Sequence, residues 1–514
     1  MGSQATGSAG KIIKNSAWLG LETIIETIVF LVSSIAVARY LGPAKLGYFS
    51  YINFFVSVVT RTSGSGLASV TRKYMSEFLA LDQPGTARAV YNLAYRYQLL
   101  GAFAITALGL GAVALFGDPA FRLMSCILIL AIVPGAMSGV LAQANSAFED
   151  VSKNTLSAIG FLVAYGTIIA LTIVFHWDLV GIASALLIGR MVEFVLRMVP
   201  LHRQLRRLPL DPLNEELTSR IRRFCIDAFG IQLLMVVVWD RSEMVFLRAF
   251  STVEQIAFYS VSFGLASNLL ALSRTFASGT GVSLMTEAVR DPKRVESIAG
   301  NASRYLLLMV FPVHLGAAAI TSEAVRFAYG AKYLSAIPVL IVASLLAIPR
   351  GFLEIPEILL RAADRQKRLL LWMTITGVVN IALDVLLIPR YAAVGAAWAN
   401  GLAQSFGIFA LWHQSRRFYQ FSFPVAVAVR LGLASTLMAG LAWFLGRSIP
   451  GLPGLVAAVG VAIPAYVVLV KVFNGLNASD RLRLAPIGRK LPGPFRSAYM
   501  AAIEFATPGA KESG

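Results

Sequence analysis

Apolar runs of about 20 residues recur from one end of this sequence to the other. At 1.5 Å per residue, a helix of this length crosses the roughly 30 Å hydrocarbon layer of a bilayer. Stretches such as 97–116, 155–175 and 454–473 are apolar on all sides, whereas the strands of a membrane barrel alternate apolar and polar positions. The sequence therefore predicts an all-α integral membrane protein.

The composition and the motifs argue against a soluble enzyme. Of the 514 residues, 57% are hydrophobic and 14% are charged, whereas a soluble domain has about a quarter of its residues charged. The sequence contains no Walker-type phosphate loop and no HExxH or GxSxG motif, and its two cysteines and four histidines lack the spacing of a metal site. We therefore expect no enzymatic activity, no cofactor and no metal.

The apolar pattern predicts about 14 transmembrane helices. Their expected ranges are 16–39, 46–70, 90–116, 121–147, 155–176, 178–200, 222–249, 256–280, 302–322, 334–359, 366–389, 392–414, 424–446 and 454–476.

Basic residues predict the orientation, because lysine and arginine are retained on the cytoplasmic side. With the N-terminus inside, about 32 of the 45 basic residues fall in cytoplasmic segments. The largest cluster, from Arg197 to Arg223, follows the sixth span. This pattern predicts a multi-pass protein of the cell inner (cytoplasmic) membrane with both termini cytoplasmic. Topology and anionic head groups explain the net charge of +18, so we expect membrane lipids and no nucleic acid as partners.

An internal repeat divides the chain. The four matches are RYLGPAKLGYFSY from Arg39 with RAFSTVEQIAFYSV from Arg248, TRTSGSG (60–66) with SRTFASG (273–279), VGIASA (180–185) with VGAAWA (394–399), and IVPG (132–135) with AIPRG (347–351). All four lie in the same order at offsets of about 209 to 215 residues. They predict two six-helix bundles related by a pseudo-twofold axis, followed by two additional C-terminal helices.

The predicted organisation has five parts. They are an N-terminal six-helix bundle (1–200), a basic cytoplasmic linker (201–221), a C-terminal six-helix bundle (222–415), two additional helices (416–476) and a basic cytoplasmic tail (477–514).

Three segments carry a family resemblance: VARYLGPAKLGYFSY at 37–51, WDRSEMVFLRAFSTVEQIAFYSVS at 239–262 and NIALDVLLIPRYAAVGAAWANGLAQ at 380–404. With these segments the chain resembles the polysaccharide transporter family, the O-antigen (Wzx-type) flippases of the multidrug/oligosaccharidyl-lipid/polysaccharide exporter superfamily. The resemblance implies a central cavity and alternating access for a polyprenyl-diphosphate-linked oligosaccharide. Unlike the usual apolar first helix of that family, this one contains Glu22 and Glu26.

The function predicted from the resemblance is a flippase that serves O-antigen, capsule or exopolysaccharide biosynthesis. A polysaccharide polymerase and a chain-length regulator are the expected protein partners. Two alternatives in the same superfamily are a lipid II flippase for peptidoglycan synthesis and a cation-coupled multidrug exporter. An exporter of cationic drugs would favour an acidic cavity, so the excess of arginine argues against it.

Arginines within the spans are the candidates for substrate binding, because a charge at mid-bilayer needs a wet cavity or a partner. Arg61 and Arg274 occupy matching places in the repeat, and guanidinium groups suit a diphosphate. Arg350, which follows Pro349, and Arg241 are the other two candidates. The alternative is a structural role, for example in salt bridges to Glu22 and Glu26.

Carboxylates within the spans are the candidates for ion coupling. These are Glu26, Asp240 and Asp384. Glu22 and Glu26 are four residues apart on one helix face, so they can raise one another's proton affinity or neutralise nearby arginines. Arg190 and Glu193, three residues apart, are predicted to form an ion pair within their helix.

Overall fold

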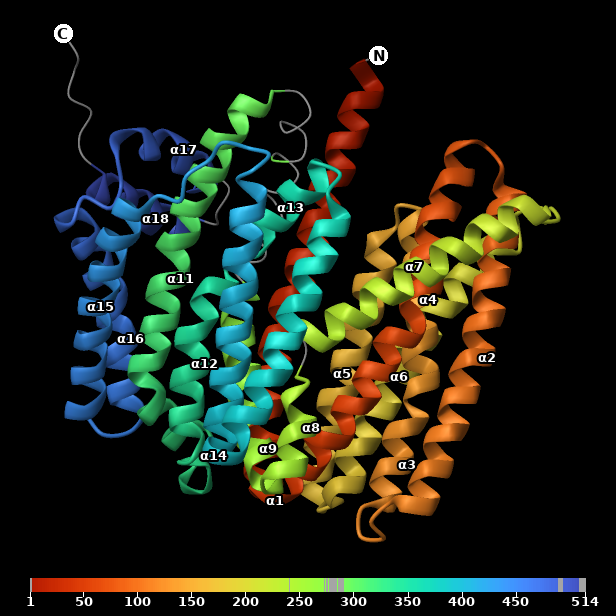
Figure 1. The fold of residues 1–514 in the computed structure, drawn as a ribbon, viewed down its shortest axis with the longest axis horizontal. Helices are drawn as coiled ribbons and strands as arrows, with labels where there is room; N and C mark the ends of the chain where they lie inside the picture. The colour runs from red at the N-terminus through yellow and green to blue at the C-terminus, as the bar shows by residue number, and fades with distance from the viewer. Residues whose placement is uncertain are drawn as a thin grey trace. The chain divides into compact units, whose positions relative to one another are not determined.

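The computed structural model describes residues 2–239, 241–271, 291–488 and 493–507, together with Ser273, Phe276 and Leu284 (Figure 1). Most of these residues are helical and none of them is in a strand, which confirms the all-α prediction. The chain separates into two compact units, Met1–Ala257 (unit 1) and Phe258–Gly514 (unit 2). The five-part organisation stays a prediction.

Unit 1 contains eight complete helices within its described residues and the start of a ninth. They are α1 (Gly2–Ala80), α2 (Pro84–Phe116), α3 (Arg122–Leu130), α4 (Ile132–Ala147), α5 (Val151–Phe175), α6 (Asp178–Leu205), α7 (Glu215–Trp239), α8 (Glu243–Phe250) and the first residues of α9 (Val253–Leu269).

Unit 2 contains the rest of α9 and, among the residues described, the remaining helices. They are α11 (Pro292–Ala328), the short 3₁₀ helix η1 (Ala331–Tyr333), α12 (Ala336–Arg350), α13 (Glu354–Ala362), α14 (Gln366–Ser415), α15 (Val425–Ser448), α16 (Leu452–Val472), α17 (Ala478–Gly488) and α18 (Gly493–Ala506).

Helix α1 is two spans joined at a sharp break. It contains 79 residues, and its backbone leaves the helical conformation at Gly42, where φ is 72° and ψ is 172°. Glycine adopts a positive φ at low steric cost, and the following residue, Pro43, has no N–H for a helical hydrogen bond. The break lies between the predicted helices 16–39 and 46–70, which are therefore confirmed as separate.

Helix α14 is a second double span. Its 50 residues break at Ala392, where φ is 48° and ψ is −126°. A Cβ atom at Gly395 would lie 2.4 Å from the carbonyl oxygen of Leu387, so this tight connection requires glycine. The predicted helices 366–389 and 392–414 are confirmed as the two parts of α14.

Ten helical segments in the described part of the chain are long and apolar enough to span a membrane. Two of them are the double spans α1 and α14, so these ten segments supply twelve crossings. Helices α7 to α9 lie where the sequence predicts the seventh and eighth helices, and the arrangement is consistent with fourteen. Large apolar side chains are exposed on these helices, for example Phe116 (87%) and Ile463 (64%), as expected for contact with lipid.

The packing of unit 1 positions its charged residues. Helix α1 packs against α2, α4 and α5, and α6 packs against α4 and α5. Near the ends of α1, α2, α4 and α6, a core forms around Tyr74, Met75, Val90, Leu141 and Leu201, all at most 1% exposed. Helices α1, α5 and α6 also contact one another, which brings their side chains together.

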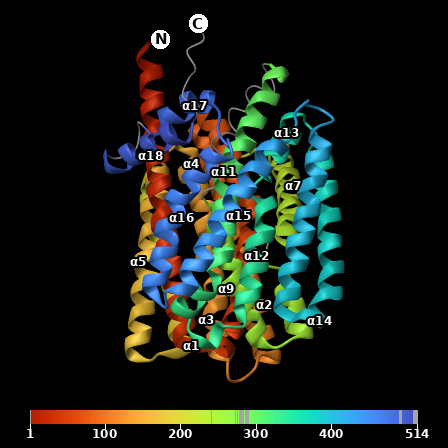
Figure 2. The same ribbon diagram turned by 90° about the vertical axis from the view of Figure 1, so that its left-hand side faces the viewer.

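The packing of unit 2 joins its bundle helices to the C-terminal helices. Helix α11 packs against α12, α15 and α16, and α12 packs against α14. Helix α18 contacts both α16 and α17, and Figure 2 shows α17 near one end of α11 and α16. The C-terminal segment is therefore part of the folded unit.

Asp480 of α17 forms hydrogen bonds with two residues of α11. It is fully buried, and its carboxylate accepts hydrogen bonds from Nη2 of Arg304 at 2.7 Å and from the hydroxyl of Tyr305 at 3.0 Å. The backbone N–H of Asn477 also donates to it at 2.7 Å, which is one of the two hydrogen bonds of a capping box at the start of α17. One carboxylate therefore both starts α17 and anchors it.

We expect Asp480→Asn to loosen α17 without unfolding the bundle. The amide keeps the shape but loses the charge-assisted hydrogen bonds, at a cost of about 1–3 kcal/mol. Hydrogen exchange in 478–488 should accelerate about 5- to 150-fold. Arg481→Ala, which breaks an exposed ion pair with Glu504, is the control and should change little. Equal exchange in both variants would contradict the anchoring role.

Candidate functional site

The structure describes three of the four predicted substrate arginines. Arg61 is exposed on the second part of α1, and Arg350 is the last residue of α12. Arg241 lies in the connection between α7 and α8, close in sequence to Glu243, which is fully buried. Arg274 lies outside the described residues. Whether these arginines bind substrate stays a prediction.

Helices α1, α4 and α6 approach closely next to Arg61. A Cβ atom at Gly135 of α4 would lie 2.9 Å from Cγ2 of Thr60 and 3.9 Å from Cδ of Arg190. The absence of a side chain at Gly135 therefore leaves room for the side chain of Thr60 and for the aliphatic part of Arg190. Thr60, the residue before Arg61, and Arg190 consequently lie beside the same glycine of α4.

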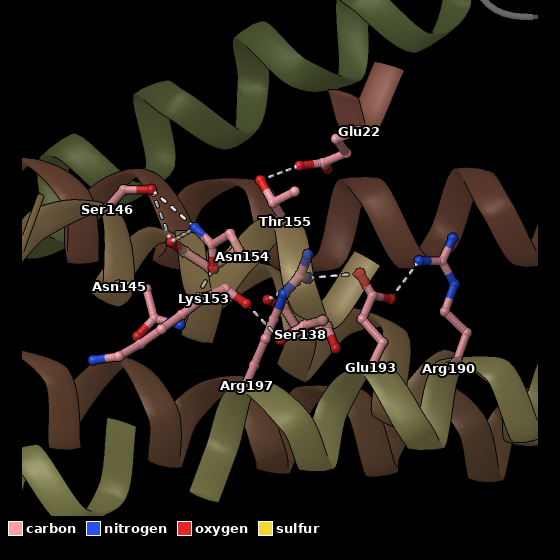
Figure 3. A network of polar contacts seen from close by, with 12 residues as sticks. Glu22, Ser138, Asn145, Ser146, Lys153, Asn154, Thr155, Arg190, Glu193 and Arg197 are labelled. Carbon is pink, nitrogen blue, oxygen red and sulfur yellow. Dashed lines mark hydrogen bonds and ion pairs between the residues drawn. The ribbon is translucent and has the colours of Figure 1, made fainter. Parts of the chain in front are cut away.

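Charged and polar residues of α1, α4, α5 and α6 gather in one part of unit 1 (Figure 3). We define the unit 1 charge cluster as Glu22, Glu26, Arg190, Glu193 and Arg197. Its centre is the carboxylate of Glu193, whose side chain is 6% exposed. Nη1 of Arg190 lies 2.8 Å from Oε2 of Glu193, and Nη1 of Arg197 lies 2.8 Å from Oε1. Both carboxylate oxygens of the buried glutamate are therefore paired with a guanidinium.

Further contacts tie this cluster to neighbouring helices. Arg197 donates a hydrogen bond to the carbonyl oxygen of Ser138 on α4 at 3.3 Å. The guanidinium of Arg190 lies 4.6 Å from the centre of the Phe161 ring on α5, a cation–π distance. Glu22 accepts a hydrogen bond of 2.7 Å from the hydroxyl of Thr155, also on α5. Four helices thus hold the cluster in place.

Glu26 is the most accessible carboxylate of the cluster. Its side chain is exposed, and it interacts electrostatically with Glu22, Arg190 and Glu193. When all five groups are ionised, three carboxylates face two guanidinium groups. The five ionised groups together carry one negative charge. Uptake of one positive charge, as a proton or a metal cation, therefore leaves the cluster neutral.

The Arg190–Glu193 pair predicted from the sequence is confirmed. Arg197 is the second partner of Glu193, whereas the charge pattern of the sequence had assigned it to the basic connection after span six. The signal was present in the sequence, because Arg197 follows Glu193 by four residues and such pairs share a helix face.

Arg350 lines a pocket within unit 2. We define the unit 2 pocket as the space between α9, α12 and α14, lined by polar residues Arg350, Ser267, Asn400 and Gln404 among mainly apolar ones. It contains about 350 Å³, including its open mouth. The guanidinium of Arg350 lies 5.5 Å from the centre of the Phe263 ring. The structure therefore places one predicted arginine in a partly enclosed, mixed polar and apolar pocket.

Asp384, a predicted ion-coupling residue, is fully buried on α14. Nδ2 of Asn380, one turn earlier, lies 3.4 Å from its Oδ2 atom. Asp240 lies outside the described residues. Within the described residues, no three His, Cys, Asp or Glu side chains form a group that could hold a metal ion. The ion-coupling roles stay predictions.

Comparison with known families identifies the family of this chain. Residues 36–338 match the family model of polysaccharide biosynthesis proteins, which is more than half of the chain. This chain belongs to that family. The resemblance noted in the sequence to polysaccharide transporters is thereby confirmed. No curated protein matches the sequence of this family member.

Solved structures with a similar fold are membrane transporters. The inward closed conformation of the lipid II flippase MurJ superposes with a TM-score of 0.70 at 17% identity, covering 90% of this chain and 98% of that one. An inward-facing multidrug resistance transporter of the MATE family and the MOP superfamily gives 0.63 at 13% identity, with 79% and 98% covered. A MOP superfamily transporter from Pyrococcus furiosus gives 0.57 at 13% identity, with 79% and 95% covered. The family member therefore has a MurJ- and MATE-like fold.

Proposed function

We propose that this protein is a flippase for a polyprenyl-diphosphate-linked oligosaccharide repeat unit. It moves the unit from the cytoplasmic to the outer leaflet for the synthesis of O-antigen, capsule or exopolysaccharide. The family match over 36–338 is the observation that supports this most, together with a fold shared with a lipid flippase over 90% of the chain. Transport alone, without enzymatic chemistry, accounts for the proposed role.

Arginine chemistry supports a diphosphate as the anchoring group of this substrate. A guanidinium stays charged at any working pH and offers two parallel N–H donors to phosphate oxygens. In the proposed mechanism Arg61 and Arg274 bind the diphosphate, and Arg241 and Arg350 contact the substrate elsewhere. The exposure of Arg61 on α1 is compatible with contact to a ligand.

We propose that an ion gradient drives the cycle, with Glu26, Asp240 and Asp384 as the coupling carboxylates. The sequence has no phosphate loop for ATP, so energy must come from another source. Glu26 is a member of the unit 1 charge cluster, which can accept one positive charge. The buried carboxylate of Asp384, with the Asn380 amide beside it, offers oxygen atoms of the kind that bind hard cations.

The proposed setting is the cell inner (cytoplasmic) membrane with both termini cytoplasmic. The excess of lysine and arginine in the predicted cytoplasmic segments supports this orientation. A polysaccharide polymerase and a chain-length regulator are the proposed partners, since they would act on the repeat units delivered to the outer leaflet.

Lipid II translocation is the second candidate, because the MurJ flippase shares the fold over nearly its whole length. Both substrates contain a polyprenyl diphosphate, so the arginines alone do not distinguish them. Cation-coupled drug export is the third candidate and is disfavoured by the arginine-rich spans.

Reconstitution tests the proposed function. We expect liposomes containing the purified protein to translocate a lipid-linked oligosaccharide faster than lipid II, and to leave a cationic dye untransported. Collapsing the ion gradients and the membrane potential should slow translocation severalfold. Faster transport of lipid II would replace the proposed substrate by the second candidate. An unchanged rate without any gradient would exclude ion coupling and leave a facilitator.

A further inference from the structure

Two buried polar atoms in the unit 2 pocket have no partner among the described residues. They are Nε2 of Gln404 on α14 and Oγ of Ser267 on α9. Gln404 is only 3% exposed. A buried polar group without a hydrogen bond destabilises a protein, and native structures rarely keep one without a reason. A bound group that supplies both missing partners would explain them.

The other walls of the pocket are mainly apolar. Large side chains such as Phe263 and Leu346 line it, and between them the alanines at 266, 343, 347 and 397 leave space. A Cβ atom at Gly401 would lie 2.3 Å from Cβ of Leu346, which shows that α14 and α12 are in direct contact beside the pocket. The volume of about 350 Å³ includes open solvent at the mouth, so the space enclosed between the helices is much smaller. The enclosed part therefore suits one substituent of a larger ligand.

The unpartnered atoms specify the chemistry of that substituent. Nε2 of Gln404 is a hydrogen bond donor and requires an acceptor, and the hydroxyl of Ser267 can accept from a donor. The space beside the alanines suits an apolar group of methyl size. A hydroxyl lacks the methyl group, and a carboxylate lacks the N–H donor. An acetamido group has a carbonyl oxygen, an N–H and a methyl, so it matches all three requirements.

We infer that the unit 2 pocket binds the acetamido (N-acetyl) group of a sugar in the transported oligosaccharide. In this arrangement the acetamido carbonyl accepts from Nε2 of Gln404, and its N–H donates to Oγ of Ser267. Asn400, one helical turn before Gln404, and Arg350 carry donors suited to sugar hydroxyls at the same wall. The inference rests on the proposed function, since it assigns selectivity for a particular sugar substituent to that substrate site.

A binding experiment on the full chain in lipid nanodiscs tests the inference, with N-acetylglucosamine and glucose as probes. In saturation-transfer NMR we expect the acetyl methyl to receive the strongest signal, and glucose to bind at least about tenfold more weakly. Gln404→Leu should weaken N-acetylglucosamine about tenfold or more without lowering the thermal midpoint, because Nε2 has no partner to lose in the free protein. A purely structural glutamine would instead lower the midpoint.

The control is Gln414→Leu, the same change on the same helix outside the pocket, and it should leave sugar binding unchanged. Ser267→Ala is the second pocket variant. If Gln404→Leu does not fold, the N-acetylglucosamine affinity of Ser267→Ala tests the inference instead. Equal affinity for the two sugars in the unmodified protein would overturn the inference. Unchanged N-acetylglucosamine affinity in the folded pocket variants would do the same.

A transport assay distinguishes a failure of this inference from a failure of the proposed function. Two lipid-linked oligosaccharides that differ only in an acetamido or a hydroxyl group are offered to reconstituted protein. If both move at equal rates and Gln404→Leu changes neither rate, the pocket assignment fails and the flippase stands. If neither moves, the proposed function itself fails. Faster transport of the acetamido substrate, lost in Gln404→Leu, supports both.

Discussion

Replacement of Glu193 by alanine is expected to destabilise the protein by about 3–5 kcal/mol, the cost of breaking a buried ion pair from one side. Glu193 pairs with both Arg190 and Arg197, and the side chain of Arg197 is only 11% exposed. Without this carboxylate, Arg197 is a buried charge that has lost its ion-pair partner. The free energy of unfolding, measured by SDS titration of the purified protein, should fall by this amount.

Two comparisons make the Glu193 prediction specific. Glu193→Met combined with Arg197→Met removes both buried charges, so it should recover most of the lost stability. Glu77→Ala breaks a more exposed pair with Arg220 and should cost no more than about 1 kcal/mol. If Glu193→Ala were no more destabilising than Glu77→Ala, the carboxylate would not stabilise the cluster.

Loss of Arg61 or Arg274 is expected to reduce the affinity for the lipid diphosphate about ten- to a hundredfold each, because charged hydrogen bonds contribute about 1.5–3 kcal/mol. The double alanine variant should lose both contributions. Lysine should rescue only in part, since it keeps the charge and loses the bidentate geometry. The measurements are binding of the lipid-linked oligosaccharide to purified protein, and the precursor that accumulates on the cytoplasmic side in cells.

Membrane levels decide how the arginine variants are interpreted. Arg447→Ala, at the exposed end of α15, is the matched control and should bind substrate normally. A double variant that reaches normal levels and exports at the full rate would rule out diphosphate binding by these residues. A double variant that does not accumulate would indicate that the arginines have the structural role instead.

Local sequence rules were sufficient for most of the membrane-spanning helices, whereas α17 and α18 lie in the segment predicted only as a basic tail. Long apolar runs predict spans because a bilayer leaves backbone groups no partner except one another. The breaks at Gly42–Pro43 and near Pro389 were visible for a similar reason, since proline removes a helical donor and glycine accepts a positive φ. The Arg190–Glu193 pair follows from spacing on one helix.

Contacts between helices required the tertiary structure. No spacing rule places Thr155 of α5 against Glu22 of α1, or Asp480 of α17 against Arg304 of α11, because these partners are more than a hundred residues apart. The same holds for the unit 2 pocket, where Ser267, Arg350 and Gln404 come from three separate helices. The sequence identified Arg350 and Glu26 as candidate site residues, but it did not predict which residues surround them.

The sequence by itself determined that this chain is a helical membrane protein of a polysaccharide transporter type. Hydropathy, charge bias and family motifs depend only on the order of the residues, so they can be recognised without the fold. Only the tertiary structure decided that Arg197 completes the pairing of Glu193 and that Gln404 and Ser267 share a pocket. The physical reason is that the energy of a buried polar group depends on what surrounds it in three dimensions. Helix packing sets those surroundings, and the same apolar pattern is compatible with many packings.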